Sequence, residues 1–158
     1  MPSVMRQLII LLLMMVSYAA WAQDSTACGP HVVRKAKQYI GVPYRAGQMS
    51  PKRGFDCSGF TTFVFRSFSI KLSRSSRTQF CEGERVDDTR QLRAGDLVFF
   101  TGSRHTTQVG HVGIVTEVDE GTGEFSFIHA TPRKGICISK STEVYYNRRY
   151  LGARRVIS

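Results

Sequence analysis

Residues 54–60 read Gly-Phe-Asp-Cys-Ser-Gly-Phe, and an apolar run with helical spacing begins directly behind them. The apolar residues of this run, at i, i+3, i+4 and i+8, are Phe60, Phe63, Val64 and Phe68. They predict a helix that begins at Cys57 with Asp56 as a favourable N-cap residue. A thiol at a helix N-terminus faces the positive end of the helix dipole, which favours the nucleophilic thiolate. Cys57 is therefore a candidate nucleophile, although a lone cysteine is more often a small core residue.

The N-terminal residues 1–22 have the pattern of a secretory signal peptide. Arg6 supplies positive charge, residues 8–16 form an uninterrupted apolar run, and Ala20-Trp21-Ala22 is a small-x-small cleavage site. The apolar run is too short for a comfortable membrane span, so no stable membrane insertion is expected after cleavage; an uncleaved anchor is the alternative. We therefore expect an exported protein, periplasmic or extracellular, in which residues 23–158 form one domain and act as a monomer.

The chain is strongly basic, with 22 Lys and Arg residues against 12 Asp and Glu residues and a formal net charge of +10. This balance favours an anionic partner, such as nucleic acid, acidic lipid or an acidic wall polymer. The basic residues are spread along the sequence without a long run or a basic-aromatic motif, which argues against nucleic acid. A soluble basic surface explains the charge equally well.

The four cysteines are Cys28, Cys57, Cys81 and Cys137. None has the Cys-x-x-Cys spacing of a zinc knuckle or a redox pair. Export permits disulfides, but if Cys57 stays free the other three allow at most one bridge. A fully reduced protein is an open alternative.

The order of the predicted elements indicates the fold class. A helical pattern over residues 32–40 ends at Gly41, residues 44–53 form a loop that brings Tyr44 towards Cys57, and a short helix follows over residues 73–80. Residues 81–93 are polar and are interpreted as a surface excursion, and His105 lies in a polar loop. Strands are predicted at 97–100, 109–118, 125–130, 135–139 and 152–157. Helices first and strands second predict an α+β fold with an antiparallel sheet.

Two histidines lie on strands that a short polar turn joins into a hairpin. Along residues 109–118, His111 shares one face with Gly113, which leaves room for a substrate backbone. If paired residue numbers sum to 240, His111 faces His129 directly; if they sum to 242, Gly113 faces His129 and His111 is the diagonal neighbour. Either register puts both rings on one face, whereas an odd register would separate them.

One thiol and two imidazoles form a plausible catalytic set. His111 would take the proton of Cys57 and later protonate the leaving amine, while His129 would fix the tautomer and direction of His111. The backbone N–H of Cys57 and the hydroxyl of Tyr44 would stabilise the oxyanion. No metal or cofactor is required by this set.

Two other interpretations use the same three residues. A Cys-His-His set with an open fourth position is also the pattern of a catalytic zinc site, but the helix start activates the thiol without a metal. The other alternative has no catalysis: the protein is a catalytically silent binding module in which the histidines only pack on the sheet. A thiol with a high pKa would favour that module.

Four motifs occur in the order and spacing of the NlpC family of cell-wall cysteine peptidases, which the chain resembles over about residues 28–156. They are Phe55-Asp56-Cys57-Ser58-Gly59-Phe60, Gly95-Asp96-Leu97-Val98-Phe99-Phe100, Gly110-His111-Val112-Gly113-Ile114 and Phe127-Ile128-His129-Ala130. The resemblance implies a papain-like fold in which the helix that carries the catalytic cysteine packs against the sheet. It also implies the substrate class, stem peptides of peptidoglycan or muropeptides, commonly cut between D-γ-glutamate and the following diamino acid.

The resemblance also assigns roles residue by residue. Cys57 is implied as nucleophile, His111 as base and His129 as the polar third member. Tyr44 matches a tyrosine near the oxyanion site, and Asp56 and Ser58 match residues that help to hold a free substrate amino terminus. The sequence departs from many members at Gly47-Gln48, where they have Gly-Gly. An amidase or acyltransferase would use the same triad, because the triad fixes the reaction class and not the leaving group.

Overall fold

The computed structural model describes residues 28–102 and 107–157. The predicted signal peptide, residues 1–22, and His105 lie outside the described residues. The helices are α2 (Cys28–Lys37), α3 (Cys57–Arg66), α4 (Ser76–Gln79), α5 (Val144–Asn147) and the 3-10 helix η1 (Thr89–Gln91). The strands are β1 (Met49–Ser50), β2 (Gly54–Phe55), β3 (Glu84–Val86), β4 (Leu97–Thr101), β5 (Val109–Val118), β6 (Phe125–Thr131), β7 (Gly135–Lys140) and β8 (Tyr150–Arg155).

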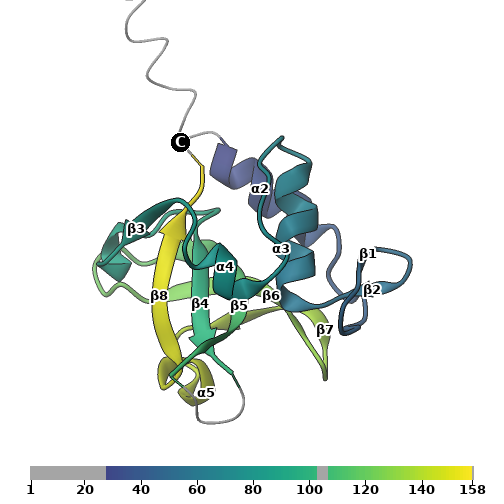
Figure 1. The fold of residues 1–158 in the computed structure, drawn as a ribbon. Coiled ribbons are helices and arrows are strands. Elements are labelled where there is room, and N and C mark those ends of the chain that lie inside the picture. Colours follow the sequence, from purple (N-terminus) through teal and green to yellow (C-terminus); the bar gives the residue numbers. More distant parts are fainter. Residues whose placement is uncertain (1–27, 103–106, 158) are drawn as a thin grey trace, which may run out of the picture.

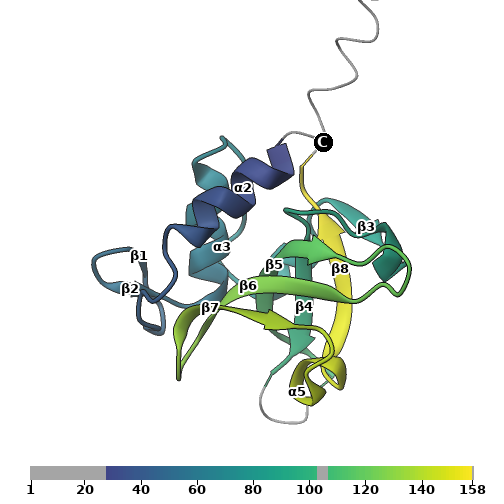
Figure 2. The same cartoon turned by 180° about the vertical axis from the view of Figure 1, so that it is seen from behind.

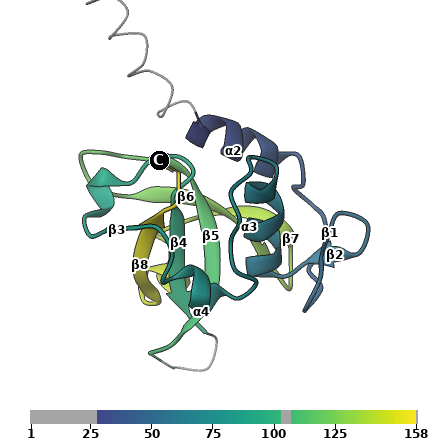
Figure 3. The ribbon, with the colours of Figure 1, turned by 45° about the horizontal axis from the view of Figure 1, so that its top comes forward.

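A six-stranded antiparallel sheet with the order β3-β8-β4-β5-β6-β7 forms one layer of the fold. Helices α2 and α3 lie beside each other against this sheet, with the small β1-β2 hairpin beyond α3 (Figures 1 and 3). The view from behind shows the C-terminal end of the chain close to the start of α2 (Figure 2). The predicted α+β class with an antiparallel sheet is confirmed.

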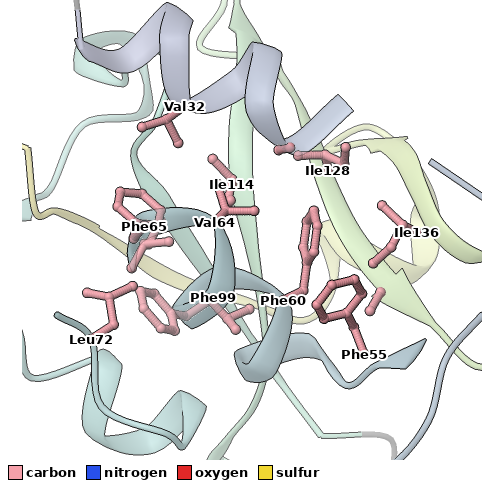
Figure 4. Packing of buried hydrophobic residues seen from close by; sticks show 14 of the residues in the cluster. Val32, Phe55, Phe60, Val64, Phe65, Leu72, Phe99, Ile114, Ile128 and Ile136 are labelled. Carbon is pink, nitrogen blue, oxygen red and sulfur yellow. The ribbon is translucent and has the colours of Figure 1, made fainter. Parts of the chain in front are cut away.

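The core between the helices and the sheet is built from the apolar face of α3. Phe60, Val64 and Phe65 are fully buried and pack with Ile114 and Ile128 of the sheet (Figure 4). The other face of the sheet has a second buried cluster, to which Val98 and Phe100 belong while Leu97 and Phe99 belong to the first. Because both faces of β4 are covered, its sequence is a continuous apolar run and not an alternating one.

Three elements differ from the sequence-based prediction. Residues 44–53, predicted to be a loop, contain β1, which pairs with β2. The predicted surface excursion contains β3, an edge strand that pairs with β8. Helix α5 interrupts a region that was predicted to contain only strands. β3 has one buried residue, Val86, and two exposed charged residues, so its composition carries no strand signal, as is common for edge strands.

The Gly95-Asp96 turn before β4 is hydrogen-bonded to the last strand, β8. Gly95 has a φ of +93°, which favours glycine, and Asp96 is almost completely buried. The guanidinium of Arg155 donates to both carboxylate oxygens of Asp96, at 2.9 and 2.7 Å, and the backbone N–H of Arg93 donates at 2.8 Å. This motif therefore ties the last strand to the start of β4.

Arg155→Met is expected to lower the free energy of unfolding by about 3–5 kcal/mol, because it leaves the buried carboxylate of Asp96 without its counter-charge. Urea unfolding followed by circular dichroism measures this loss. Adding Asp96→Asn to Arg155→Met removes the stranded charge and should recover part of the stability. A loss below about 1 kcal/mol for the single variant, the size of an exposed ion pair, would contradict the argument.

None of the helices in the described part of the chain is long and apolar enough to cross a bilayer. All four cysteines are free thiols in the structure.

Candidate active site

Cys57 is the first residue of α3, as predicted, and Asp56 is its N-cap. The Oδ1 atom of Asp56 accepts a hydrogen bond of 2.7 Å from the backbone N–H of Gly59. This bond satisfies one of the free N–H groups of the first turn. The cap fixes where the helix begins and therefore where the thiol lies.

Arg74 holds this cap in place. Its guanidinium donates to both carboxylate oxygens of Asp56, at 2.9 and 2.6 Å, and to the hydroxyl of Ser58 at 3.0 Å. The backbone N–H of Gly47 donates to Oδ2 of Asp56 at 2.8 Å. Sequence reasoning missed Arg74, since nothing in the local pattern connects it with a residue 18 positions away. Both oxygens of Asp56 are thus occupied by N–H donors.

The imidazole rings of His111 on β5 and His129 on β6 contact each other. The pairs Ile114↔Ile128 and Val115↔Phe127 give the 242 register, one of the two that were predicted, in which Gly113 lies opposite His129. Nε2 of His111 lies 2.7 Å from Nδ1 of His129. A side chain at position 113 would have no room, because a Cβ there would lie 2.7 Å from the Phe127 ring and 3.2 Å from Cβ of His129. A register shift between Val115 and Glu117 comes only beyond the histidines.

Ser139 on β7 extends this contact to a third side chain. Its Oγ lies 3.1 Å from Nε2 of His129, and the ring of Tyr146 packs edge to face with the same imidazole. If Oγ accepts from Nε2–H of His129, then Nδ1 of His129 accepts from Nε2–H of His111, and Nδ1 of His111 keeps its lone pair. This tautomer is the one that a general base at His111 requires. Sequence reasoning missed Ser139 and Tyr146.

Ser139→Ala is expected to lower kcat by about 3–10-fold with little change in KM, because Nε2 of His129 then keeps only the weak contact with the Cys137 thiol at 3.8 Å. Ring nitrogen chemical shifts of His129 report the tautomer directly. Ser126→Ala, on the neighbouring strand, is the matched control, and Ser139→Thr should restore the rate. An unchanged tautomer mixture in Ser139→Ala would contradict this role.

The electrostatics of the resting site differ from the sequence-based expectation. Burial raises the pKa of the Cys57 thiol, and the charge of Asp56 raises it further. Hydrogen bonds from the backbone N–H groups of Ser58 and Val112 act in the opposite direction but are outweighed. The helix start therefore lowers the pKa of the thiol as predicted, but burial and Asp56 outweigh this effect, and the thiol form prevails in the resting protein.

The histidines are neutral in the resting site as well. Burial lowers the pKa of His111 to about 4. Burial, followed by the charges of His111 and Lys134, lowers the pKa of His129 to about 2, and His129 is fully buried. At neutral pH the site therefore contains a thiol and two neutral imidazoles, and the thiol needs a base to become a nucleophile.

A pocket of ≈ 650 Å³ opens over these residues and is lined by Cys57, His111 and Tyr44. Burial and the negative charge of a Cys57 thiolate raise the pKa of the Tyr44 hydroxyl, which therefore stays protonated and able to donate a hydrogen bond. Asp56 and Ser58 do not belong to the pocket wall; they contact Arg74 beside it. The structure thus brings four of the six predicted site residues together, three in the pocket and His129 behind His111.

The direction of the histidine ring nitrogens bears on the zinc interpretation. Within residues 28–102 and 107–157, no three His, Cys, Asp or Glu side chains are grouped as metal ligands would be. The facing nitrogens of His111 and His129 contact each other at 2.7 Å, and so they are turned towards one another and not towards a shared ion.

Comparison with known proteins identifies the family of the chain. The model of the NlpC/P60 family matches residues 41–155. The chain belongs to the NlpC/P60 family. This confirms the resemblance that the four motifs carry. The NlpC/P60 assignment covers β1 to β8 and includes the residues of the pocket.

Individual NlpC/P60 relatives differ in their names. The chain is 36% identical over 135 residues to a Gamma-DL-glutamyl hydrolase of Bacillus subtilis, covering 85% of this chain and 31% of that protein. It is 42% identical over 119 residues to an Escherichia coli protein named Murein DD-endopeptidase MepS/Murein LD-carboxypeptidase, covering 75% of this chain and 57% of that protein. The chain thus spans between about a third and somewhat over half of these relatives.

Solved NlpC/P60 structures share the fold. A family protein from Bacillus cereus superposes with a TM-score of 0.71 at 30% identity, over 80% of this chain and 39% of that chain. The predicted papain-like arrangement, with the cysteine helix packed against the antiparallel sheet, is the one that this NlpC/P60 neighbour has.

Proposed function

We propose that this protein is a cysteine peptidase that hydrolyses stem peptides of peptidoglycan through a thioester intermediate. The observation that carries the proposal is the convergence of Cys57 and the coupled pair His111–His129 on one pocket, on a helix and a sheet that are packed against each other. The names of the relatives, which include a murein endopeptidase and a glutamyl hydrolase, support the substrate class.

In the proposed reaction, Nδ1 of His111 takes the proton of the Cys57 thiol as sulfur attacks the scissile carbonyl carbon. The oxyanion accepts hydrogen bonds from the backbone N–H of Cys57 and the hydroxyl of Tyr44. His111 then gives its proton to the leaving nitrogen, the C–N bond breaks, and a thioester and a free amine remain. A water molecule, deprotonated by His111, attacks the thioester and releases the acid and the thiol.

The scissile bond that we propose is the one between D-γ-glutamate and the following diamino acid. The substrate amino terminus would lie on the side of the thiol where Asp56 and Ser58 are held by Arg74. Because Arg74 already neutralises Asp56, a substrate ammonium there would share the carboxylate with the guanidinium. His129, fully buried, acts through His111 and does not touch the substrate.

We further propose that residues 1–22 direct export and that the enzyme works as a monomer in the cell envelope. Amino-terminal sequencing of the protein recovered from the envelope fraction would find Gln23 as the first residue. An uncleaved amino terminus in that fraction would contradict the signal peptide.

A catalytically silent wall-binding module is the second candidate, because a thiol with a raised pKa is what such a module would show. Trapping the intermediate separates the two. We expect an acid-quenched mixture of protein and stem peptide to contain protein that is heavier by the L-alanyl-D-γ-glutamyl group, attached at Cys57. Adding a nucleophilic amine distinguishes an acyltransferase, which would give the amide as main product instead of the acid. Binding without any acylated protein would favour the silent module.

A further inference from the structure

Two cationic side chains line the active-site pocket and have no function in the reaction described above. Arg133 and Lys134, from the turn between β6 and β7, line the same pocket as Cys57 and His111. Both side chains are exposed, and neither takes part in any of the ion pairs within the described residues. Unpaired cations in a substrate pocket are ready to bind an anion.

The register of the β6-β7 hairpin places both cations near the catalytic pair. Arg133 and Lys134 belong to the turn that directly follows β6, the strand of His129, and the last pair of the hairpin is Thr131↔Gly135. The pocket that they line is also lined by Cys57 and His111. A ligand bound by the two cations in this pocket would therefore share it with the reacting thiol. The positive charge of Lys134 contributes to the lowered pKa of His129, which agrees with this placement.

The turn that carries both residues is held firmly. The Thr131 hydroxyl accepts from the backbone N–H of Lys134 at 3.1 Å. The backbone N–H of Ile136 donates to the carbonyl of Val42 at 2.9 Å, which ties the turn to the segment that leads to Tyr44. Gly135 has a φ of +67°, and a Cβ there would lie 2.2 Å from the carbonyl oxygen of Val42. The backbone beneath the two cations is thus preorganised.

One acidic side chain also belongs to the pocket wall. This residue is Glu143, the N-cap of α5. Its Oε1 accepts a hydrogen bond from the backbone N–H of Lys140 at 2.8 Å. Glu143 would repel a carboxylate from its own side of the pocket. An anionic group of the substrate is thereby directed towards the β6-β7 turn.

We propose that Arg133 and Lys134 form a subsite for a carboxylate of the substrate, beside the reaction centre. The inference rests on the proposed function and adds a determinant of specificity to it. A stem tripeptide offers such a carboxylate in three places: on the α-carbon of D-γ-glutamate, on the side chain of diaminopimelate, and at the carboxyl terminus. Stems in which the bound carboxylate is amidated or missing should be poor substrates.

A set of four peptides identifies the carboxylate. The parent is L-alanyl-D-γ-glutamyl-diaminopimelate, and each of the others has one change: D-isoglutamine for D-glutamate, lysine for diaminopimelate, or a carboxyl-terminal amide. The proteins compared are wild type, the double variant Arg133→Gln with Lys134→Gln, and Lys71→Gln, an exposed lysine outside the pocket wall, as control. The readout is kcat/KM for each peptide.

In wild type, we expect one of the three changes to lower kcat/KM by about tenfold, the discrimination typical of one lost charged hydrogen bond. The double variant should lose about tenfold on the parent, and the same change should then cost nothing more, because the two effects are coupled. Lys71→Gln should behave as wild type. Equal losses on all four peptides, or no loss on any, would overturn the subsite.

A binding measurement separates this proposal from the proposed function. Two proteins that cannot turn over are compared: Cys57→Ala, and Cys57→Ala combined with the double variant. Calorimetric titration gives the Kd of each protein for each of the four peptides. If wild type cleaves no peptide but the double variant loses affinity for one carboxylate, the peptidase proposal fails and the subsite stands. If all four peptides bind equally well to Cys57→Ala with and without the double variant, the subsite proposal fails, whatever the activity of the wild type.

Discussion

His111→Gln is expected to lower kcat/KM for stem-peptide hydrolysis by about 10³–10⁴-fold, the upper range for removal of a general base. Burial raises the pKa of the Cys57 thiol, so little thiolate is present at neutral pH. Burial also lowers the pKa of His111 to about 4, so the imidazole is neutral and can accept the proton throughout the physiological range. Without His111 the thiol keeps its proton and the leaving nitrogen has no acid.

The matched controls for this variant are two other histidines. His31→Gln changes an exposed residue of α2 and should leave kcat/KM unchanged. His129→Gln should have a smaller effect than His111→Gln, because an amide can still hold the ring of His111 although it cannot fix the tautomer as well. Circular dichroism verifies the fold of each variant. If His129→Gln lost as much activity as His111→Gln in a folded protein, the division of roles between base and orienting residue would be wrong.

The second large effect is acid destabilisation by the two neutral imidazoles, of which His129 is fully buried and His111 is partly exposed to the pocket. The folded-state pKa values of His111 and His129 lie at about 4 and about 2, below the 6.5 of an exposed histidine. Well above pH 6.5 both states are neutral and the stability is full. As the pH falls below 6.5, the unfolded chain binds protons that the folded protein excludes, so the free energy of unfolding falls. Between pH 7 and 5 the loss is about 2 kcal/mol for each histidine, and this figure is an upper bound for His111, which is only partly buried.

Urea unfolding at pH 7, 6.5, 6, 5.5 and 5 measures this slope, in a range above the titration of most carboxylates. The variant His129→Gln is the control, because it removes one of the two titrating groups whatever it does to the absolute stability. Its slope should be about half that of the wild type. A free energy of unfolding that stays flat from pH 6.5 to 5 in the wild type would show that the imidazoles are accessible to protons in the folded state.

The parts of the site that follow from local pattern could be predicted from the sequence. Helical spacing behind Cys57 and the capping preference of Asp56 place the thiol at the start of α3. The two-residue period of β5 puts His111 and Gly113 on one face, and either even register of the hairpin adds His129 to that face, whereas an odd register would not. In the register that the structure has, Nε2 of His111 lies 2.7 Å from Nδ1 of His129.

The parts that depend on contacts between distant segments could not be predicted. Arg74 reaches Asp56 only because the chain after α3 folds back beside the helix start. Ser139 reaches His129 only because β7 adds to the far side of β6. The raised pKa of Cys57 has the same origin, since burial depends on what the whole fold packs around the thiol. A sequence pattern shows the helix dipole but not the desolvation that opposes it.

The measurement that tests the central claim most directly is mass spectrometry of two substrates, purified peptidoglycan and free L-alanyl-D-γ-glutamyl-diaminopimelate peptide. Each is incubated with the wild-type protein and with its Cys57→Ala variant. The proposed function predicts new amino termini at the diamino acid with the wild type and none with the variant, and the preferred substrate then distinguishes action on intact wall from action on free fragments. No cleavage of either substrate, or equal cleavage by Cys57→Ala, would contradict it.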